Sequence, residues 1–263
     1  MYQPFALQFE CAISLQSVRK IMRRALVLLL FSGCASAQQA GEPLRVVTDY
    51  WPPFRMQGAG GQLEGLDIDL LDELQRRTGL RFEVRLQPWA RALEDMRRGQ
   101  ADLMTGLART PERGQYIDYL EPTYHACAPR LYGAPERAAI GDYAQLGGMR
   151  IGYVLQSAYF EPFDSDAALH KAGVKNEEQL LQMQVRGRVE LMIGTDCQVD
   201  FQLRDPMLSR QLVKLAYLPP AQTRLYLGLS RTGRGAAERE LLTRTLQQLL
   251  QDGWMERAAQ RYR

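Results

Sequence analysis

The chain has 263 residues, of which 46% are hydrophobic and 24% charged, so a disordered chain, a collagen-like repeat and a small disulfide-rich scaffold are excluded. This length suffices for one large domain or two modest domains. The first 37 residues hold four basic residues and one acidic residue, which leaves 29 of each sign in the remainder and accounts for the whole formal charge of +3. A neutral body gives no support for nucleic-acid binding.

Residues 1–37 have the pattern of a leader with a signal peptide. Basic residues, a short apolar run over 25–31 and a small-residue exit at Ala37 are typical of secretory signals. The apolar run is well below the roughly 20 residues that a spanning helix needs. Met22 would be a natural start for such a leader. Two alternatives for processing stay open: cleavage after Ala37, which we favour, and lipoprotein acylation at Cys34. Both predict that the rest of the protein is exported.

Export sets the chemistry of the two cysteines that survive cleavage after Ala37. Cys127 and Cys197 would meet an oxidising compartment, where thiols tend to pair. Two interpretations stay open, a disulfide between them or two buried free thiols that pack as small hydrophobic side chains. With His125 and His170 as the only histidines and no Cys-x-x-Cys motif, we expect neither a metal site nor a cofactor.

The first half of the body alternates between strand and helix patterns. Apolar spacing, strict alternation and terminating glycines (Gly79 and Gly99) predict these elements. Strand–helix–strand succession requires helical crossovers and therefore parallel strands in an α/β domain. In chain order we expect a strand over 44–48, a helix over 66–78, a strand over 81–86, a helix over 88–98, a strand over 102–105 and a helix beginning at 110–113.

A second alternation follows Pro135 and predicts a second α/β unit. The whole pattern indicates a two-lobed α/β protein, in which the cleft between the lobes is the default ligand site. The expected elements are a strand over 149–154, a helix opening at Ser157, a helix over 177–185, a strand over 189–193, extended structure over 214–218, a strand over 225–229 and two helices over 236–261 broken at Gly253.

Signatures of common enzymes are absent from the sequence. It has no Gly-x-Ser-x-Gly elbow, no phosphate-binding loop and no His-Glu-x-x-His motif. The glycine-rich run over 58–65 fails the dinucleotide fingerprint, because Leu63 stands where the third glycine belongs. This run favours a hairpin-like loop.

Two tryptophans stand at equivalent places in the predicted topology. Trp51 follows the first strand in a Trp-Pro-Pro-Phe segment, and Trp89 begins the second helix just after a strand. Ligands of α/β proteins bind at such strand ends, so the two rings could form two walls of one pocket. The alternative for each ring is a core position under a loop.

Arg113 is the candidate anion-binding residue. The preceding strand ends at Thr105 and Gly106, where a glycine allows a ligand close to the backbone. A cation in the first turn of the predicted helix is disfavoured by about 0.3–1 kcal/mol, and a bound carboxylate would offset that misfit. The alternative is a solvated contact of Arg113 with Glu112 or Asp118.

These residues resemble the bacterial extracellular solute-binding proteins of family 3, the amino-acid-binding receptors of ABC importers. The resemblance implies a periplasmic protein with a type II periplasmic-binding fold, in which two α/β lobes joined by two crossover strands close on a ligand. It implies lobe 1 over 43–127 plus 225–263 and lobe 2 over 128–224. The matching segments are 48–54, 63–69, 99–102, 107–113 and 118–124.

The resemblance also implies a set of ligand-binding residues. Arg113 would hold the ligand carboxylate, and Asp196 would lie near its ammonium, with Thr195 as the alternative position. This chain departs from the common pattern at Gln156-Ser157-Ala158 and at Ala108, where hydroxyl residues are frequent. The complete implied set is Trp51, Trp89, Thr105, Gly106, Ala108, Arg113, Ser157, Ala158 and Asp196.

The expected function is capture of a small amino-acid-like or carboxylate ligand by a monomeric receptor, for delivery to a membrane permease of an ABC importer. Two alternatives stay open. One is a periplasmic enzyme on the same scaffold, similar to cyclohexadienyl dehydratase, with Glu161, Asp164 or Asp196 as general acid. The other is a ligand sensor without transport.

Overall fold

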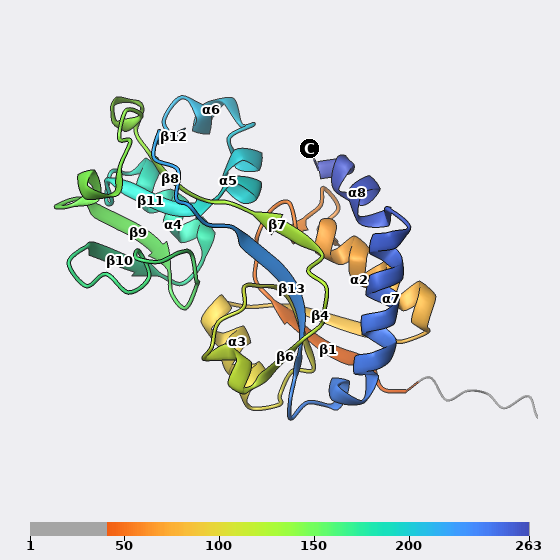
Figure 1. The fold of residues 1–263 in the computed structure, drawn as a ribbon. Coiled ribbons are helices and arrows are strands. Elements are labelled where there is room, and N and C mark those ends of the chain that lie inside the picture. Colours follow the sequence, from red (N-terminus) through yellow and green to blue (C-terminus); the bar gives the residue numbers. More distant parts are fainter. Residues whose placement is uncertain (1–40, 263) are drawn as a thin grey trace, which may run out of the picture. The chain divides into compact units, whose positions relative to one another are not determined.

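The computed structural model describes residues 41–262 (Figure 1), and the predicted leader with Met22, Cys34 and Ala37 lies outside them. Two main sheets organise the described chain. The first has the strand order β4-β1-β5-β13-β6, and the second has the order β10-β9-β11-β8-β12. Mixed α/β structure with two sheets confirms the predicted fold class.

The first sheet is parallel where the chain crosses through helices. β1 pairs in parallel with β4 and β5, while β13 pairs antiparallel with β5 and β6. Parallel pairing follows from the crossover helices α2 and α3 between these strands. The strands are β1 (Leu44–Thr48), β4 (Phe82–Leu86), β5 (Leu103–Leu107), β6 (Ile117–Tyr119) and β13 (Thr223–Ser230).

Helices cover the first sheet and bury their apolar stripes. Helix α2 begins and ends at the predicted residues, and Gly79 ends it with a left-handed φ of 74°. Leu70 and Leu74 of α2 share a core cluster with Leu242 and Leu246 of α7. The helices are α2 (Leu66–Thr78), α3 (Trp89–Arg97), α7 (Arg239–Gln251) and α8 (Trp254–Ala259).

The second sheet has its own helices and its own core cluster. β9 pairs in parallel with β10 and β11, and β8 pairs antiparallel with β11 and β12. The strands are β8 (Pro129–Gly133), β9 (Arg150–Val154), β10 (His170–Val174), β11 (Leu191–Thr195) and β12 (Val213–Lys214). The helices are α4 (Glu177–Val185), α5 (Asp196–Gln202) and α6 (Pro206–Ser209).

Two segments carry the chain between the sheets. β7 (His125–Cys127) leads to β8 of the second sheet and pairs antiparallel with the first residues of β13, which return the chain to the first sheet. Figure 1 shows β7 and the start of β13 side by side. We propose the lobe boundaries at these crossings, with lobe 1 over 43–127 plus 225–263 and lobe 2 over 128–224.

Two local predictions differ from the structure, and the sequence did not predict β6, β7, β8, β10, α5 and α6. No helix opens at Ser157: residues 161–165 form turns, because Pro162 lacks a backbone donor and Phe163 is pinned in the core. The helix expected from 110–113 is only a 3₁₀ turn at Arg113–Gln115. Strand β10 was not predicted, because this edge strand is mostly half-buried or exposed and lacks a clear alternation.

The run over 58–65 forms the expected hairpin, with β2 (Met56–Gln57) paired to β3 (Leu63–Glu64). The hairpin delivers the chain into α2 through Gly65. A Cβ atom at Gly65 would lie 2.3 Å from the carbonyl oxygen of Phe54, so only glycine fits there. Within residues 41–262, no helix combines the length and the apolar character needed to cross a membrane.

Candidate functional site

A cavity of about 60 Å³ lies between the lobes, with room for a few water molecules. Both lobes contribute to its wall. Lobe 1 and the crossing strand β13 supply Asp49, Trp51, Arg55, Trp89, Gly106, Ala108, Arg113, Thr223 and Leu225, and lobe 2 supplies Ser157, Ala158, Tyr159, Glu177, Gly194 and Thr195.

Seven of the nine residues that the sequence implied for ligand binding line this cavity. They are Trp51, Trp89, Gly106, Ala108, Arg113, Ser157 and Ala158. Thr105 and Asp196 are not part of the wall. Thr105 is fully buried in β5, and its hydroxyl donates to Oγ1 of Thr48 at 3.3 Å, so it supports the first sheet.

Arg113 is buried between the lobes, and no carboxylate within residues 41–262 pairs with it. Only 4% of the residue is exposed, and its Nη1 and Nη2 donate to the carbonyl oxygens of Ala108 and Gln156 at 2.8 and 2.6 Å. Its guanidinium carbon lies 5.6 Å from the ring centre of Trp89. Burial lowers the pKa of Arg113, because the cation has lost water without gaining an anion.

The alternative of a solvated ion pair at Arg113 does not match these contacts. Glu112 pairs with Arg97, and Asp118 pairs with Arg239, so both acids are engaged elsewhere. The argument from the helix dipole also fails, because a three-residue 3₁₀ turn has no appreciable macrodipole. The case for an anion at Arg113 therefore depends on its burial.

Gln156 joins the lobes through its backbone. Its carbonyl oxygen accepts from Nη2 of Arg113 and, at 3.2 Å, from Nε1 of Trp89. Its φ of 64° is the single left-handed value outside glycine among the described residues. A carbonyl from lobe 2 thus lies where two lobe 1 donors converge, and an anionic ligand would compete for the same donors.

A buried ionic cluster borders the cavity through Asp49 and Arg55, and the sequence did not predict it. Nη2 of Arg55 donates to Asp49 at 2.5 Å and Nη1 donates to Asp67 at 2.6 Å, with all three side chains at most 8% exposed. Burial opposes the charge of Arg55, but the two carboxylates more than offset that effect and raise its pKa. The guanidinium also lies 5.0 Å from the ring centre of Trp51.

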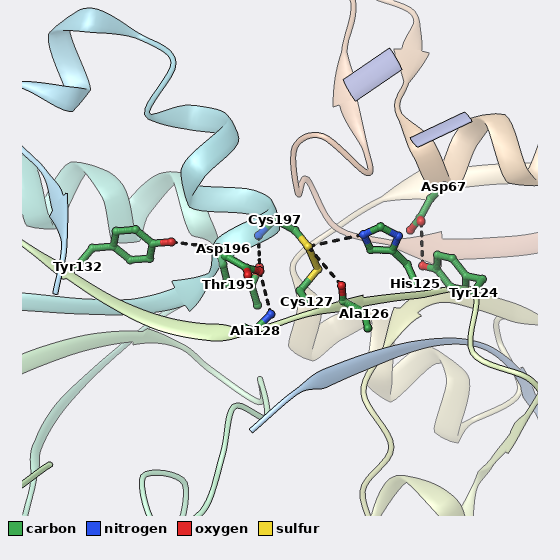
Figure 2. Close-up of a disulfide and its surroundings, with 10 residues drawn as sticks. All are labelled: Asp67, Tyr124, His125, Ala126, Cys127, Ala128, Tyr132, Thr195, Asp196 and Cys197. Carbon is green, nitrogen blue, oxygen red and sulfur yellow. Dashed lines mark hydrogen bonds between the residues drawn. A yellow bond between two sulfur atoms is a disulfide. The ribbon is translucent and has the colours of Figure 1, made fainter. Parts of the chain in front are cut away.

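Gly106 gives Arg55 the space it occupies. A Cβ atom at Gly106 would lie 2.4 Å from Nη1 of Arg55, and φ is 70°. The Gly106 N–H donates to the hydroxyl of Tyr124, which donates in turn to Asp67 at 2.8 Å (Figure 2). The close approach predicted at this glycine is therefore made by Arg55. The sequence signal for the cluster was limited to Asp49 in the matching segment 48–54 and Asp67 in the matching segment 63–69.

Three polar atoms in the cavity wall have no hydrogen-bond partner among the described residues. They are Oε2 of Glu177 and the hydroxyl oxygens of Thr195 and Thr223. Each residue is less than 9% exposed. Burial, reinforced by the charge of Asp49, raises the pKa of Glu177 to about 8. Nothing in the sequence marked Glu177 beyond its place at the start of a helix.

Asp196 faces the backbone between β7 and β8 (Figure 2), and it is not part of the cavity wall. Its Oδ1 accepts from the backbone amides of Ala128 and Cys197 at 2.8 and 2.7 Å. Cys197 forms a disulfide with Cys127, with sulfur atoms 2.10 Å apart. These contacts hold the start of α5 against Cys127 and Ala128. The ammonium-binding role implied for Asp196 therefore has no geometric support. Thr195 lines the cavity wall instead.

Glu161 and Asp164, the other acids considered for catalysis, lie outside this cavity. Both are exposed and line an outer groove that also reaches Arg113. Glu161 accepts from the hydroxyl of Ser165, and Asp164 accepts from the backbone amide of Tyr159 at 2.9 Å. Both contacts lie within an exposed loop and hold that loop together.

Comparison with known proteins gives one family. The sequence model of the bacterial extracellular solute-binding proteins, family 3, matches residues 44–263. The histidine-binding periplasmic protein of Salmonella typhimurium is 31% identical over 54% of this chain and 55% of its own length. The chain spans about half the length of the curated relatives it matches.

Solved structures share the fold. An amino acid ABC transporter substrate-binding protein from Streptococcus pneumoniae, bound to L-arginine, has a TM-score of 0.73 and 16% identity over 84% of this chain and 93% of its own. A histidine kinase sensor domain with similarity to periplasmic binding proteins has a TM-score of 0.76 and 16% identity over 86% and 97%. These matches confirm a type II periplasmic-binding fold.

Proposed function

Because this chain belongs to the bacterial extracellular solute-binding proteins, family 3, we propose that it is a periplasmic receptor that binds an amino acid between its lobes. Delivery to the permease of an ABC importer is part of this proposal, as are cleavage of the leader and export. The printed names of relatives support the ligand class: one is a histidine-binding periplasmic protein, and one solved neighbour carries L-arginine.

The burial of Arg113 is the observation that carries the proposal. Arg113 is 4% exposed, and among the described residues its guanidinium has two carbonyl partners, so it gains more from a carboxylate than any exposed arginine would. Two parallel N–H groups match the two oxygens of a carboxylate. The ring of Trp89 beside the guanidinium keeps water away and strengthens the electrostatic attraction.

Residues of both lobes line the cavity, so a ligand would gain its full set of contacts only when the lobes are closed. A ligand shifts a conformational equilibrium by its difference in affinity for the two states. Binding would therefore favour the closed form, which a permease can distinguish from the open form. The bond from Arg113 to the Gln156 carbonyl would be exchanged for the ligand carboxylate.

The test is calorimetry on residues 38–263 with L-amino acids and matched organic acids. We expect binding of at least one amino acid, and a loss of at least about thirtyfold in Arg113→Met, since truncating one partner of a buried charge pair costs about 2 kcal/mol or more. Arg91→Met is the matched control, because Arg91 is exposed and close to Trp89 in sequence. Equal affinity of both variants, or no binding to the unmodified protein, would contradict the proposal.

Uptake needs a separate measurement. Cells that lack this chain should take up the labelled ligand more slowly, and the intact gene should restore uptake. Normal uptake in cells without this protein would contradict the proposed transport role and would not affect the proposal of ligand binding.

A further inference from the structure

Glu177 is a carboxylate in the cavity wall that no described residue neutralises. It is 6% exposed, and its Oε2 has no hydrogen-bond partner within residues 41–262. The other carboxylate of the wall, Asp49, is bound by Arg55 at 2.5 Å. An ionised carboxylate without a partner is unfavourable in such a place, so a cationic donor at Oε2 of Glu177 would remove that cost.

The protein's own structure does not account for Glu177. It is the first residue of α4, where an acid can cap a helix, but the side chain of Asn176 already accepts from the Gln179 amide at 2.8 Å. A carboxylate kept only for the helix would lie in solvent, as the neighbouring Glu178 does. The burial of Glu177 toward the cavity therefore points to a ligand.

The groups that face Glu177 in the described part of the chain supply no free cation. Burial, Asp49 and Arg55 determine its ionisation, and Tyr159 is the further titratable group that interacts with it. Arg55 is occupied by Asp49 and Asp67, and the hydroxyl of Tyr159 accepts from the Val154 amide at 3.1 Å. With one guanidinium between two carboxylates, the cluster beside Glu177 carries a net negative charge that would further attract a cation.

Two hydroxyl groups share the cavity wall with Glu177. Thr195 ends β11 of lobe 2, and Thr223 begins β13 on the crossing strand. Their Oγ1 atoms are buried and unpartnered like Oε2 of Glu177. Three such atoms from three different elements around one cavity make a built polar site, in which hydroxyl groups can complete the hydrogen bonds of an ammonium or amidinium group.

We propose that Glu177 binds the positively charged nitrogen of the ligand, while Arg113 holds its carboxylate. This inference rests on the proposed function and specifies it, because it assigns one residue of lobe 2 to the cationic group of the ligand. Arg113 lies in the 3₁₀ turn of lobe 1 and Glu177 begins α4 of lobe 2, and both line the cavity, so the two anchors come from opposite lobes.

The experiment compares ligands that differ only by the cationic group. L-Arginine is paired with L-citrulline, in which the side-chain charge is lost, and L-glutamine is paired with its analogue without the α-amino group. We expect the unmodified protein to prefer the cationic member of at least one pair by about tenfold to a hundredfold, the range of a hydrogen bond to a charged group. Glu177→Gln should reduce that preference to near unity, because the amide keeps the shape and removes the charge.

Glu178→Gln is the matched control, since it removes the same charge from the exposed neighbour on the same helix. It should retain the preference of the unmodified protein. A preference that survives in Glu177→Gln, or binding without preference in either pair, would overturn the assignment of Glu177 and leave the proposed function intact. Absence of binding by every amino acid would instead count against the proposed function itself.

Discussion

Replacing Arg55 with methionine tests whether the ionic cluster beside the cavity determines stability. Methionine keeps much of the side-chain volume and removes the guanidinium. Asp49 and Asp67 then lose their shared partner while they remain buried, at 6% and 0% exposure. The stacking of the guanidinium on Trp51 is lost as well.

The expected loss follows from this burial. Breaking a buried ion pair by removing one partner costs about 3–5 kcal/mol, because the remaining charge is uncompensated. For a domain of this size, each kcal/mol lowers the melting temperature by about 2–4 °C, so we expect a decrease of about 6–20 °C. Tyr124 still donates to Asp67, which keeps the loss within that range.

The loss should depend on pH. Burial raises the pKa of Asp49 even with Arg55 present, and removal of the cation raises it further. A carboxyl group whose pKa is higher in the folded state than in the unfolded state destabilises the fold as pH rises through the folded pKa. The deficit of Arg55→Met should therefore be largest at pH 7 and above, and should shrink toward pH 4.

Urea denaturation followed by circular dichroism measures this free energy at several pH values. Arg109→Met is the matched control, because Arg109 also pairs with an acid, Glu121, and stacks on tyrosine rings, but on the surface. Its loss should stay near or below about 1 kcal/mol. An equal loss in both variants, or a deficit in Arg55→Met that does not change with pH, would refute the reasoning.

Two further predictions concern the disulfide and Glu177. The double change Cys127→Ser and Cys197→Ser opens a cross-link between residues 70 positions apart and should destabilise the protein by about 2–4 kcal/mol in urea denaturation, whereas a reducing agent should lower the stability of the unmodified protein but leave the variant unaffected. Burial raises the pKa of Glu177 from 4.5 to about 8. The contribution of this carboxyl group to the stability of the fold is therefore complete below pH 4.5 and is lost as pH rises through 8. Glu177→Gln should therefore gain stability over the unmodified protein between pH 5 and 9, by at most about 5 kcal/mol. A constant difference over that range would show that Glu177 is solvated.

Elements with a strong apolar period were predictable from the sequence. Helices α2 and α4 begin and end where their leucine spacing and the glycines beyond them predict. The parallel pairing of β1 with β4 and β5 followed from the alternation of strands and helices. Such signals are local, because one buried face fixes the period of a helix or strand. The prediction of a helix after Ser157 was wrong, because packing of Phe160 and Phe163 in the core of lobe 2 fixes this segment and no apolar periodicity does.

The same division holds for the site. The sequence alone identified three candidate site residues, Trp51, Trp89 and Arg113, because each stands at a strand end or in a recognisable segment. All three line the cavity. Arg55 and Glu177 could not, because their significance depends on which charges the fold brings beside them. The sequence by itself determined where β1, β4 and β9 end and which residue types follow them. Only the tertiary structure decided that two acids neutralise the guanidinium of Arg55, while Glu177 lines the cavity without a partner among the described residues. The reason is that charge compensation depends on distance through space and not on separation along the sequence.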